Sequence, residues 1–536
     1  MIIPVLYALD SLINCDEWQE MTEASVAPAT ATGFFGRFGG SLTRRGSWRT
    51  TPRLIEILFV SILLLCAIVL FGSQSAITRY QHAVERIGRE AEPTVLTAEK
   101  LTQALADMDA EIADSALGND AAWPLYVADS NRVSALLVRL SRDVGYSGTE
   151  TTGLIDLVAE LRGYFQKIGG ASVTSAEITG TNEQMAMTTT LWASRLLRRD
   201  LIPRAQIIKA RAGADLAEAY ADYRNGSALA LGLALLPLLL LLCMLLLTQL
   251  VLTRRTRRLV NLPLAVTALL LTGYVAWFGV TAAGDRAAIM SAKEDFFDDL
   301  KVVSDTTIAA QLMKADESMW LFEYRHVPFE ERRLRQHYAH AFMNSAEQLF
   351  DCAGPAAADG AGKQPAIDYT AVEALAAVLA RCEPLLQGGQ AKAGAVPAGF
   401  TGPLADELRR GSAGNESRDT SPAEDAAARD AASSAISAFL SFLKIDRQVR
   451  LLALGGDRNQ AVQLSIGHEA GAGNGAYGAL SAALGRLVDL DEGGFMQRID
   501  AADRHIGVMS AGLSIILVLT VFSAMAGLWP RYREYL

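Results

Sequence analysis

The sequence predicts an all-α membrane protein with four transmembrane helices, two extracytoplasmic antiparallel helical-bundle domains and an internal repeat. Four apolar stretches each approach the roughly 20 residues that a helix needs to cross a hydrocarbon core about 30 Å thick. The two long polar segments between them carry apolar residues at steps of three and four, the period of an amphipathic helix. Sustained alternation of polar and apolar residues, which would indicate strands, is absent.

These patterns divide the chain into consecutive parts. In order they are a disordered cytoplasmic tail (1–53), a first span (54–72), a first helical bundle (73–227), a second span (228–252), an arginine-rich cytoplasmic turn (253–261), a third span (262–281), a second helical bundle (282–505) with a flexible insert (354–425), a fourth span (506–528) and a cytoplasmic tail (529–536). The tail and the insert are rich in small and polar residues, which cannot bury a core. Met21 is an alternative start. No small-residue cleavage site follows the first span, so we expect an uncleaved anchor.

Arginine predicts the orientation. Eleven arginines flank the spans, in the N-terminal tail, the turn 253–261 and the C-terminal tail. By contrast, segment 74–225 holds 16 basic and 20 acidic residues, and segment 284–505 holds 22 and 32. Positive residues stay on the cytoplasmic side, so we expect both termini and the turn in the cytoplasm and both bundles outside, in a cell membrane. The net charge of −10 makes a nucleic-acid partner improbable. The arginines also favour contacts with anionic lipids of the bilayer.

Within the first bundle, segment 96–117 shows one apolar stripe on a helix. Its acidic residues, Asp107, Asp109, Glu111 and Asp114, are interpreted as a solvated face.

Three tryptophans of the two bundles, Trp123, Trp192 and Trp320, are interpreted as bundle core, with ligand stacking as the alternative. Each half of the chain has the order span, long outer helix, further helices and a last helix that enters the next span. ALADMDAE (104–111) can be laid over AAQLMKADE (309–317), which indicates a repeat.

No catalytic motif is found, so we expect neither an enzyme nor a cofactor. GAGNGAYG (471–478) follows no strand and precedes no Lys-Ser/Thr pair, so it predicts a connection between helices and not a phosphate loop. His337 and His340, near Glu330 and Glu331, come nearest to a metal site, but a solvated charged helix explains them better.

Two cysteines, Cys352 and Cys382, lie in the segment expected outside the cytoplasm, where an oxidising environment permits a disulfide. We predict that they pair in a structural disulfide.

The composition of the spans argues against transport, since the second, third and fourth contain no Asp, Glu, Lys, Arg or His. Small residues of the fourth span would let helices pack closely; they are Ser510, Ser514, Ala524 and Gly527.

Several segments resemble a known family. These are LLRRDLIPRA (196–205), LTRRTRRLVN (252–261), the segment 459–495 and AGLWPRYREY (526–535). With the order of spans and helical domains, they are similar to the actinobacterial four-pass GlnX-type membrane signalling proteins, over about 50–350 and 425–536. The insert 354–425 and the paired external cysteines depart from that family.

The resemblance implies a non-enzymatic signal relay. Its partners would be an extracytoplasmic amino-acid-binding lipoprotein, for aspartate, glutamate or glutamine, and a cytoplasmic Ser/Thr protein kinase. The chain could also form a homo-oligomer. The candidate cytoplasmic partner surface consists of Arg254, Arg255, Arg257, Arg258, Arg531, Tyr532, Arg533 and Tyr535.

Two other classes of function stay open. The helical domains could bind a small ligand directly, as the sensor domains of chemoreceptors do. Alternatively, the chain is a structural or assembly factor of the cell envelope. Binding assays with amino acids separate the two kinds of sensing. Amino acids that bind the protein alone indicate direct sensing, and binding only in the presence of a binding protein indicates indirect sensing.

Overall fold

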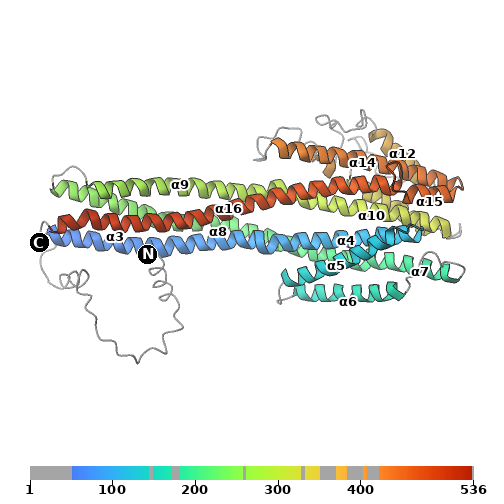
Figure 1. The fold of residues 1–536 in the computed structure, drawn as a ribbon, viewed down its shortest axis with the longest axis horizontal. Helices are drawn as coiled ribbons and strands as arrows, with labels where there is room; N and C mark the ends of the chain where they lie inside the picture. Colours follow the sequence, from blue (N-terminus) through green and yellow to red (C-terminus); the bar gives the residue numbers. More distant parts are fainter. Residues whose placement is uncertain are drawn as a thin grey trace, which may run out of the picture.

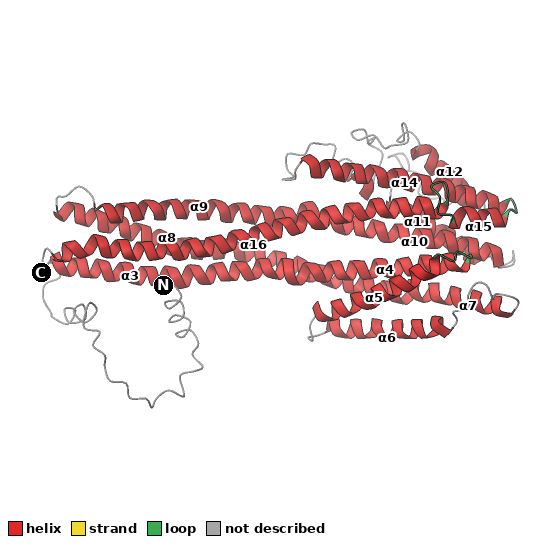
Figure 2. Cartoon of the chain, viewed as in Figure 1, coloured by secondary structure: helices red, strands yellow, loops and turns green. Residues whose placement is uncertain are grey.

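The computed structural model describes residues 51–143, 149–170, 181–256, 261–326, 332–349, 370–382, 402–406 and 422–533. Within these ranges the regular structure is helical and contains no strand (Figure 2). The all-α prediction with four candidate membrane-spanning helices is therefore confirmed. The predicted tail 1–53 and insert 354–425 lie largely outside the described residues.

Four long helical paths run the length of the molecule (Figure 1). Two lead from the narrow end to the broad end: α3 (Thr51–Glu85) continues into α4 (Glu92–Ala116), and α9 (Leu262–Ala292) continues into α10 (Asp298–His326). Two return as single helices, α8 (Ile202–Thr256) and α16 (Gly473–Arg533). At 1.5 Å per residue, the 61 residues of α16 span roughly 90 Å.

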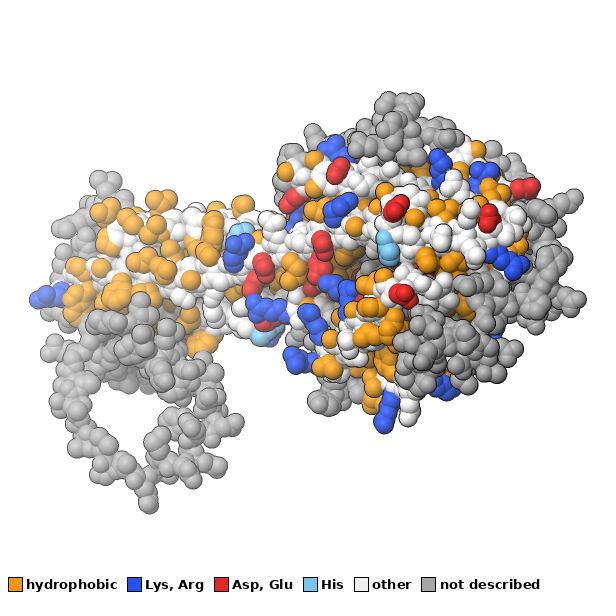
Figure 3. Space-filling model, turned by 45° about the vertical axis from the view of Figure 1, so that its right-hand side comes forward, with side chains coloured by type: hydrophobic (Ala, Val, Ile, Leu, Met, Phe, Trp, Pro, Cys, Tyr) orange, Lys and Arg blue, Asp and Glu red, His pale blue; other side chains and the backbone are white. Residues whose placement is uncertain are grey.

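The narrow end is the membrane-spanning part. There, α3, α8, α9 and α16 pack together around a shared apolar core. Many large apolar side chains nevertheless point outward, as on Leu64, Leu240, Leu269 and Phe522. They give this end the largely apolar surface visible in Figure 3. Such a surface is stable in lipid, so the sequence and the structure agree that this part crosses a membrane.

Two helical domains form the broad end (Figure 1). The first joins α4 and the start of α8 to α5 (Ala122–Asp143), α6 (Thr149–Gly170) and α7 (Thr181–Leu196). The second joins α10 and the start of α16 to four further helices, which are α11 (Arg332–Leu349), α12 (Thr370–Cys382), α14 (Pro422–Leu454) and α15 (Arg458–Ile466). Leu375 and Cys382 of α12 are fully buried, so this helix belongs to the core although it lies within the predicted insert.

The repeat is visible in a local irregularity. Both outgoing paths contain a π-helical turn at a corresponding place, Arg86–Ala91 between α3 and α4 and Lys293–Phe297 between α9 and α10. A third, Leu197–Leu201, joins α7 to α8. Pro93 and Pro203 follow two of these turns. Because proline has no N–H to donate to the preceding turn, the local widening lets the helix continue in the same direction.

The predicted connection between helices is only partly right: residues 467–472 connect α15 to α16, and the glycine-rich segment 471–478 forms the end of this connection and the first turns of α16. A Cβ on Gly473 would lie 2.3 Å from the Ser465 carbonyl oxygen, and one on Gly475 would lie 1.9 Å from that of Glu469. Only glycine permits this close approach of the first turn of α16 to the end of α15 and to the connecting loop.

Candidate functional site

The strongest candidate for a functional site is a layer of buried charges between the two helical domains. It lies where α4 of the first repeat packs against α10 of the second. We call it the polar layer and define it by five carboxyl groups and three cations. These are Asp109, Asp114, Asp316, Glu317 and Asp446, with Arg198, Lys314 and Arg450.

Arg198 bridges the repeats. Its π-helical turn, Leu197–Leu201, brings the guanidinium between α4 and α10. Nε lies 2.5 Å from Oδ2 of Asp109, and Nη1 bonds Asp316. The guanidinium also lies 5.4 Å from the ring centroid of Tyr338 on α11. Burial raises the pKa of Asp316 to about 6, although Arg198 opposes that shift.

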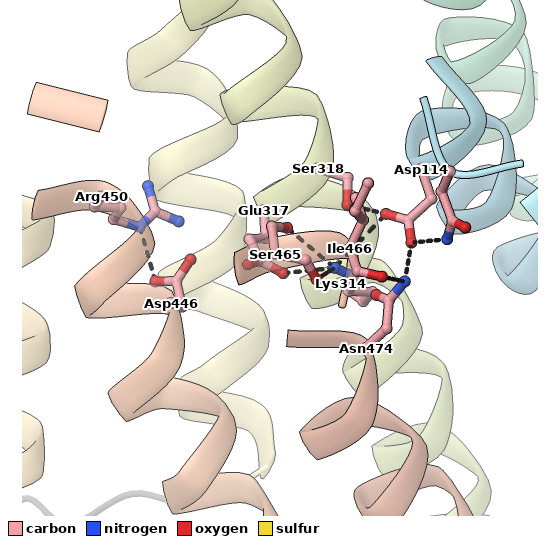
Figure 4. A network of polar contacts seen from close by, with 10 residues as sticks. Asp114, Lys314, Glu317, Ser318, Asp446, Arg450, Ser465, Ile466 and Asn474 are labelled. Carbon is pink, nitrogen blue, oxygen red and sulfur yellow. Dashed lines mark hydrogen bonds and ion pairs between the residues drawn. The ribbon is translucent and has the colours of Figure 1, made fainter. Parts of the chain in front are cut away.

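Lys314 is the second bridge (Figure 4). Its ammonium group is 2.8 Å from Oε2 of Glu317 and 3.6 Å from Oδ1 of Asp114, which belongs to the other repeat. It also donates to the carbonyl oxygen of Ser465, at 3.4 Å. Burial raises the pKa of Glu317, while Lys314 lowers it.

Asp114 accepts further hydrogen bonds from the second repeat. The Ser318 hydroxyl donates to Oδ1, and the Asn474 amide donates to Oδ2 at 2.7 Å. The same amide also donates to the Ile466 carbonyl oxygen, at 3.2 Å. One carboxylate of α4 therefore holds α10 and the first turn of α16 together.

Arg450 extends the layer into α14. It donates to Oδ2 of Asp446 at 2.8 Å, and its guanidinium lies 4.6 Å from the ring centroid of Trp320 and 4.8 Å from that of Phe342. Nη1 and Nη2 have no hydrogen-bond partner within the described residues. Contact with two aromatic faces partly compensates for this loss of hydration.

The predicted solvated face of α4 is therefore wrong. Asp109 and Asp114 are buried, and Asp107 and Glu111 are only partly exposed. The reason is tertiary, because α4 packs against α5, α8 and α10 on several sides. Glu111 forms a hydrogen bond with Asp129 of α5; burial and this neighbour raise the pKa of Glu111 to about 10. Burial and Asp129 also raise the pKa of Asp107, to about 8.

The prediction that three tryptophans lie in the bundle cores holds for two of them. Trp320 lies in the core of the second domain, and Trp192 packs against that of the first with Lys167 4.2 Å from its ring centroid. Trp123 is 37% exposed, so its assignment to the core is wrong. His337 and His340 are exposed, as expected of a solvated helix, and Glu330 and Glu331 lie outside the described residues.

Cys382 is disulfide-bonded and buried. Its predicted partner, Cys352, lies outside the described residues, so the pairing of these two residues stays a prediction. Cys66 and Cys243, within the spans, are free.

At the narrow end, the structure brings together the helix termini that carry the predicted cytoplasmic surface. Asn261, which directly precedes α9, donates its amide to the Gly527 carbonyl oxygen of α16 at 2.7 Å. Ser523 donates to the Pro263 carbonyl oxygen at 2.6 Å. Small size at Gly527 matters, because a Cβ there would meet Asn261 and Leu264 at 3.1 Å.

The individual surface residues are only partly described. Arg254 and Arg255 lie in the last turn of α8, and Arg531, Tyr532 and Arg533 end α16, where Arg533 is exposed. Arg257, Arg258 and Tyr535 lie outside the described residues.

Fold and site together define a helical membrane protein whose paired domains meet at a buried polar layer. Residues 83–221, which run from the end of α3 to about the first third of α8, match the family described as "Actinobacterial sensor domain". The match supports an actinobacterial sensor protein, with a role in sensing or signalling. Neither a curated protein nor a solved structure matches the chain.

Proposed function

We propose that this protein is a non-enzymatic relay that reports amino-acid availability outside the cell to a cytoplasmic Ser/Thr protein kinase. In this proposal an amino-acid-binding lipoprotein, loaded with aspartate, glutamate or glutamine, contacts the helical domains. The sensor-domain match supports a sensing role. The resemblance to GlnX-type proteins supports these particular partners.

The observation that carries the proposal is the continuity of the return helices. α8 begins directly after the π-helical turn that holds Arg198, and Asn474 is the second residue of α16, so both helices start at the polar layer. Both end at the opposite end of the molecule. A shift or rotation of either helix at the layer can therefore reach its far end without an intervening loop.

The polar layer provides a reason for discrete states. A buried ion pair that loses one partner leaves an uncompensated charge, at a cost of about 3–5 kcal/mol. Intermediate registers of α4 against α10 are therefore unfavourable, and two complete pairings separated by a barrier are expected. A loaded lipoprotein would change the balance through its different affinity for the two arrangements.

We further propose that both termini and the turn 253–261 face the cytoplasm. The distribution of arginine supports this orientation. The hydrogen bond from Asn261 to Gly527 supports a shared output surface, because it joins that turn to the end of α16.

The proposal is tested in cells that carry the full chain. Arg254, Arg255, Arg257 and Arg258 are replaced together by glutamine, and Ser/Thr phosphorylation of cytoplasmic proteins is quantified before and after addition of glutamine or aspartate. We expect the response to be lost while the amount of protein in the membrane stays unchanged. The control replaces Arg139 and Arg142, two exposed arginines of α5, and should respond as the wild type does. An unchanged response in the four-arginine variant would contradict the relay.

Two further measurements separate the alternatives. A reporter fused within 74–225 should be active only outside the cytoplasm; activity in the cytoplasm would overturn the orientation. Calorimetry of the purified chain with aspartate, glutamate and glutamine should show binding only when the lipoprotein is present. Binding to the chain alone would favour direct sensing.

A further inference from the structure

A cavity of about 380 Å³ opens between α3 and α8 where the first two spans meet the helical domains. On α3 it extends from Gly72 to Ala83, and on α8 from Asp222 to Pro237. The fifteen steps from Asp222 to Pro237 correspond to roughly 22 Å along the helix axis. This exceeds half of a hydrocarbon core about 30 Å thick, so the cavity passes from the acyl-chain region of the bilayer to its surface.

The two ends of the cavity differ in chemistry. Gly72, Ala230, Leu233 and Pro237 line the end within the predicted spans. Leu233 is 47% exposed, so this end opens toward the side of the helix pair, where lipid chains lie. The end nearer the helical domains is lined by Arg79, Asp222 and the hydroxyl pair of Tyr80 and Tyr223, whose oxygens are 2.7 Å apart.

The charge at the polar end is not balanced within the cavity. Asp222 accepts from Arg86 at 3.2 Å, so its charge is already paired. Arg79 is exposed and, within the described part of the chain, takes part in no hydrogen bond or ion pair. Its guanidinium is available to an anion, and it presents the planar donor set that suits a phosphate group.

A proline in α8 and a glycine in α3 shape the apolar end of the cavity. Pro237 lies inside α8 and has no N–H to donate, so one backbone hydrogen bond of the helix is missing there. Ser73 donates its hydroxyl to the Ala234 carbonyl oxygen at 2.9 Å, and so satisfies a backbone group near that site. Gly72 faces the proline, and a Cβ on it would lie 3.8 Å from the proline ring. A small residue therefore leaves the space open.

The second repeat fills the space at a comparable depth. There, Tyr274 of α9 packs against Gly512 of α16, where a Cβ would lie 3.0 Å from the ring, and its hydroxyl donates to the Met509 carbonyl oxygen at 2.8 Å. The α3–α8 pair has no such side chain between its helices at Gly72. The cavity is therefore a feature of the first repeat and not a general consequence of the packing.

We propose that this cavity binds a phospholipid of the leaflet next to the helical domains, with the phosphate on Arg79 and one acyl chain along Gly72, Leu233 and Pro237. The occupant is a lipid because the apolar end opens at the level of the bilayer, where a water-soluble ligand is scarce. Arginine at the polar end selects a phosphate group. This site does not depend on the identity of the signalling partners.

The test is native mass spectrometry of the full chain, purified in a nonionic detergent and incubated with phosphatidylglycerol. Arg79→Gln removes the phosphate contact, and Gly72→Leu places a side chain in the apolar end. Each should lower the fraction of chain with bound lipid about tenfold, which corresponds to about 1.4 kcal/mol. Inorganic phosphate at millimolar concentration should not displace the lipid.

Two matched controls accompany these variants. Arg224→Gln removes an exposed arginine of α8 that does not line the cavity, and Gly232→Leu adds the same side chain at an exposed glycine of the same span. Both should bind lipid as the wild type does. If Arg79→Gln and Gly72→Leu bound as much lipid as the wild type, with unchanged helical circular dichroism, the proposal would be overturned. Equal loss in all four variants, or displacement by inorganic phosphate, would also overturn it.

Discussion

Asn474, the second residue of α16, donates its side-chain amide to Oδ2 of Asp114 at 2.7 Å. Asp114 lies in the last turns of α4, and the two residues are 360 positions apart in the chain. The contact therefore joins the outgoing helix of the first repeat to the returning helix of the second. Since α16 continues to Arg533, a group buried at the broad end is linked by one helix to the narrow end.

We predict that Asp114→Ala strongly destabilises the domains. The change removes the acceptor of Ser318 and Asn474 and leaves Lys314 buried with one carboxylate partner fewer. Loss of one partner of a buried pair costs about 3–5 kcal/mol. The measurement is the thermal midpoint of helical circular dichroism in detergent micelles. Asp215→Ala, at an exposed position of α8, is the control and should leave the midpoint unchanged. Equal midpoints for the two variants would show that the layer contributes little.

The sequence was sufficient to predict the fold, because its two strongest signals concern the chain locally. Apolar stretches of about 20 residues and a period of 3.6 residues do not depend on which helices become neighbours. The same reasoning could not find the polar layer. Arg198 pairs with Asp109 and Asp316, which are 89 and 118 positions away in the sequence, and no local sequence pattern predicts such long-range pairs. The small residues of α4, in ALADMDAEIADSA, were the available signal, since they allow neighbours to pack closely on every side.

Stability should depend on pH through Glu111. Its pKa is raised from 4.5 in the unfolded chain to about 10, so between these values the folded protein holds a proton that the unfolded chain has released. The contribution to stability is complete below pH about 4.5 and is lost as the pH rises toward 10. Glu111→Gln is neutral throughout and removes this dependence. The thermal midpoint of the variant should therefore fall less than that of the wild type between pH 5 and pH 8.

The control for this pH dependence is Glu218→Gln, at an exposed position of α8. It should keep the wild-type slope, because the substitution leaves the buried carboxyl group of Glu111 in place. If Glu111→Gln and the wild type lost stability in parallel, the carboxyl group of Glu111 would not hold a proton in the folded protein over this pH range.

Two adjacent glycines of α16 should respond in opposite ways to the same change. A Cβ on Gly494 would lie 2.2 Å from the ring of Phe296, in the π-helical turn Lys293–Phe297, whereas a Cβ on Gly493 would meet nothing within 4 Å. Gly494→Ala should cost about 1–3 kcal/mol through overpacking. Gly493→Ala should stabilise by up to about 1 kcal/mol, because alanine favours helices. Thermal midpoints of the two variants test this directly, and a loss at Gly493 equal to that at Gly494 would contradict the close approach of α16 to the turn.

At the narrow end, Asn261→Ala should loosen the connection between the turn 253–261 and α16. Asn261 occupies the N-cap position of α9, but its side chain makes no capping hydrogen bond and its amide instead donates to the Gly527 carbonyl oxygen at 2.7 Å. Losing that hydrogen bond costs about 0.5–1.5 kcal/mol, which raises the population of locally open states by up to about tenfold. Because cleavage follows the open population when reclosing is fast, trypsin should cut at the arginines of the turn faster by a similar factor in lipid nanodiscs.

The matched control for this variant is Asn225→Ala, an exposed asparagine near the opposite end of the second span. It should leave the rate of tryptic cleavage at the turn unchanged. Faster cleavage in Asn261→Ala alone would support one assembled surface formed by the turn and the end of α16. Equal rates in both variants and the wild type would mean that the turn moves independently of α16. A movement of α16 would then displace only the part of the proposed kinase-binding surface that α16 itself carries. Signalling to the kinase would then depend on Arg531, Tyr532 and Arg533 alone.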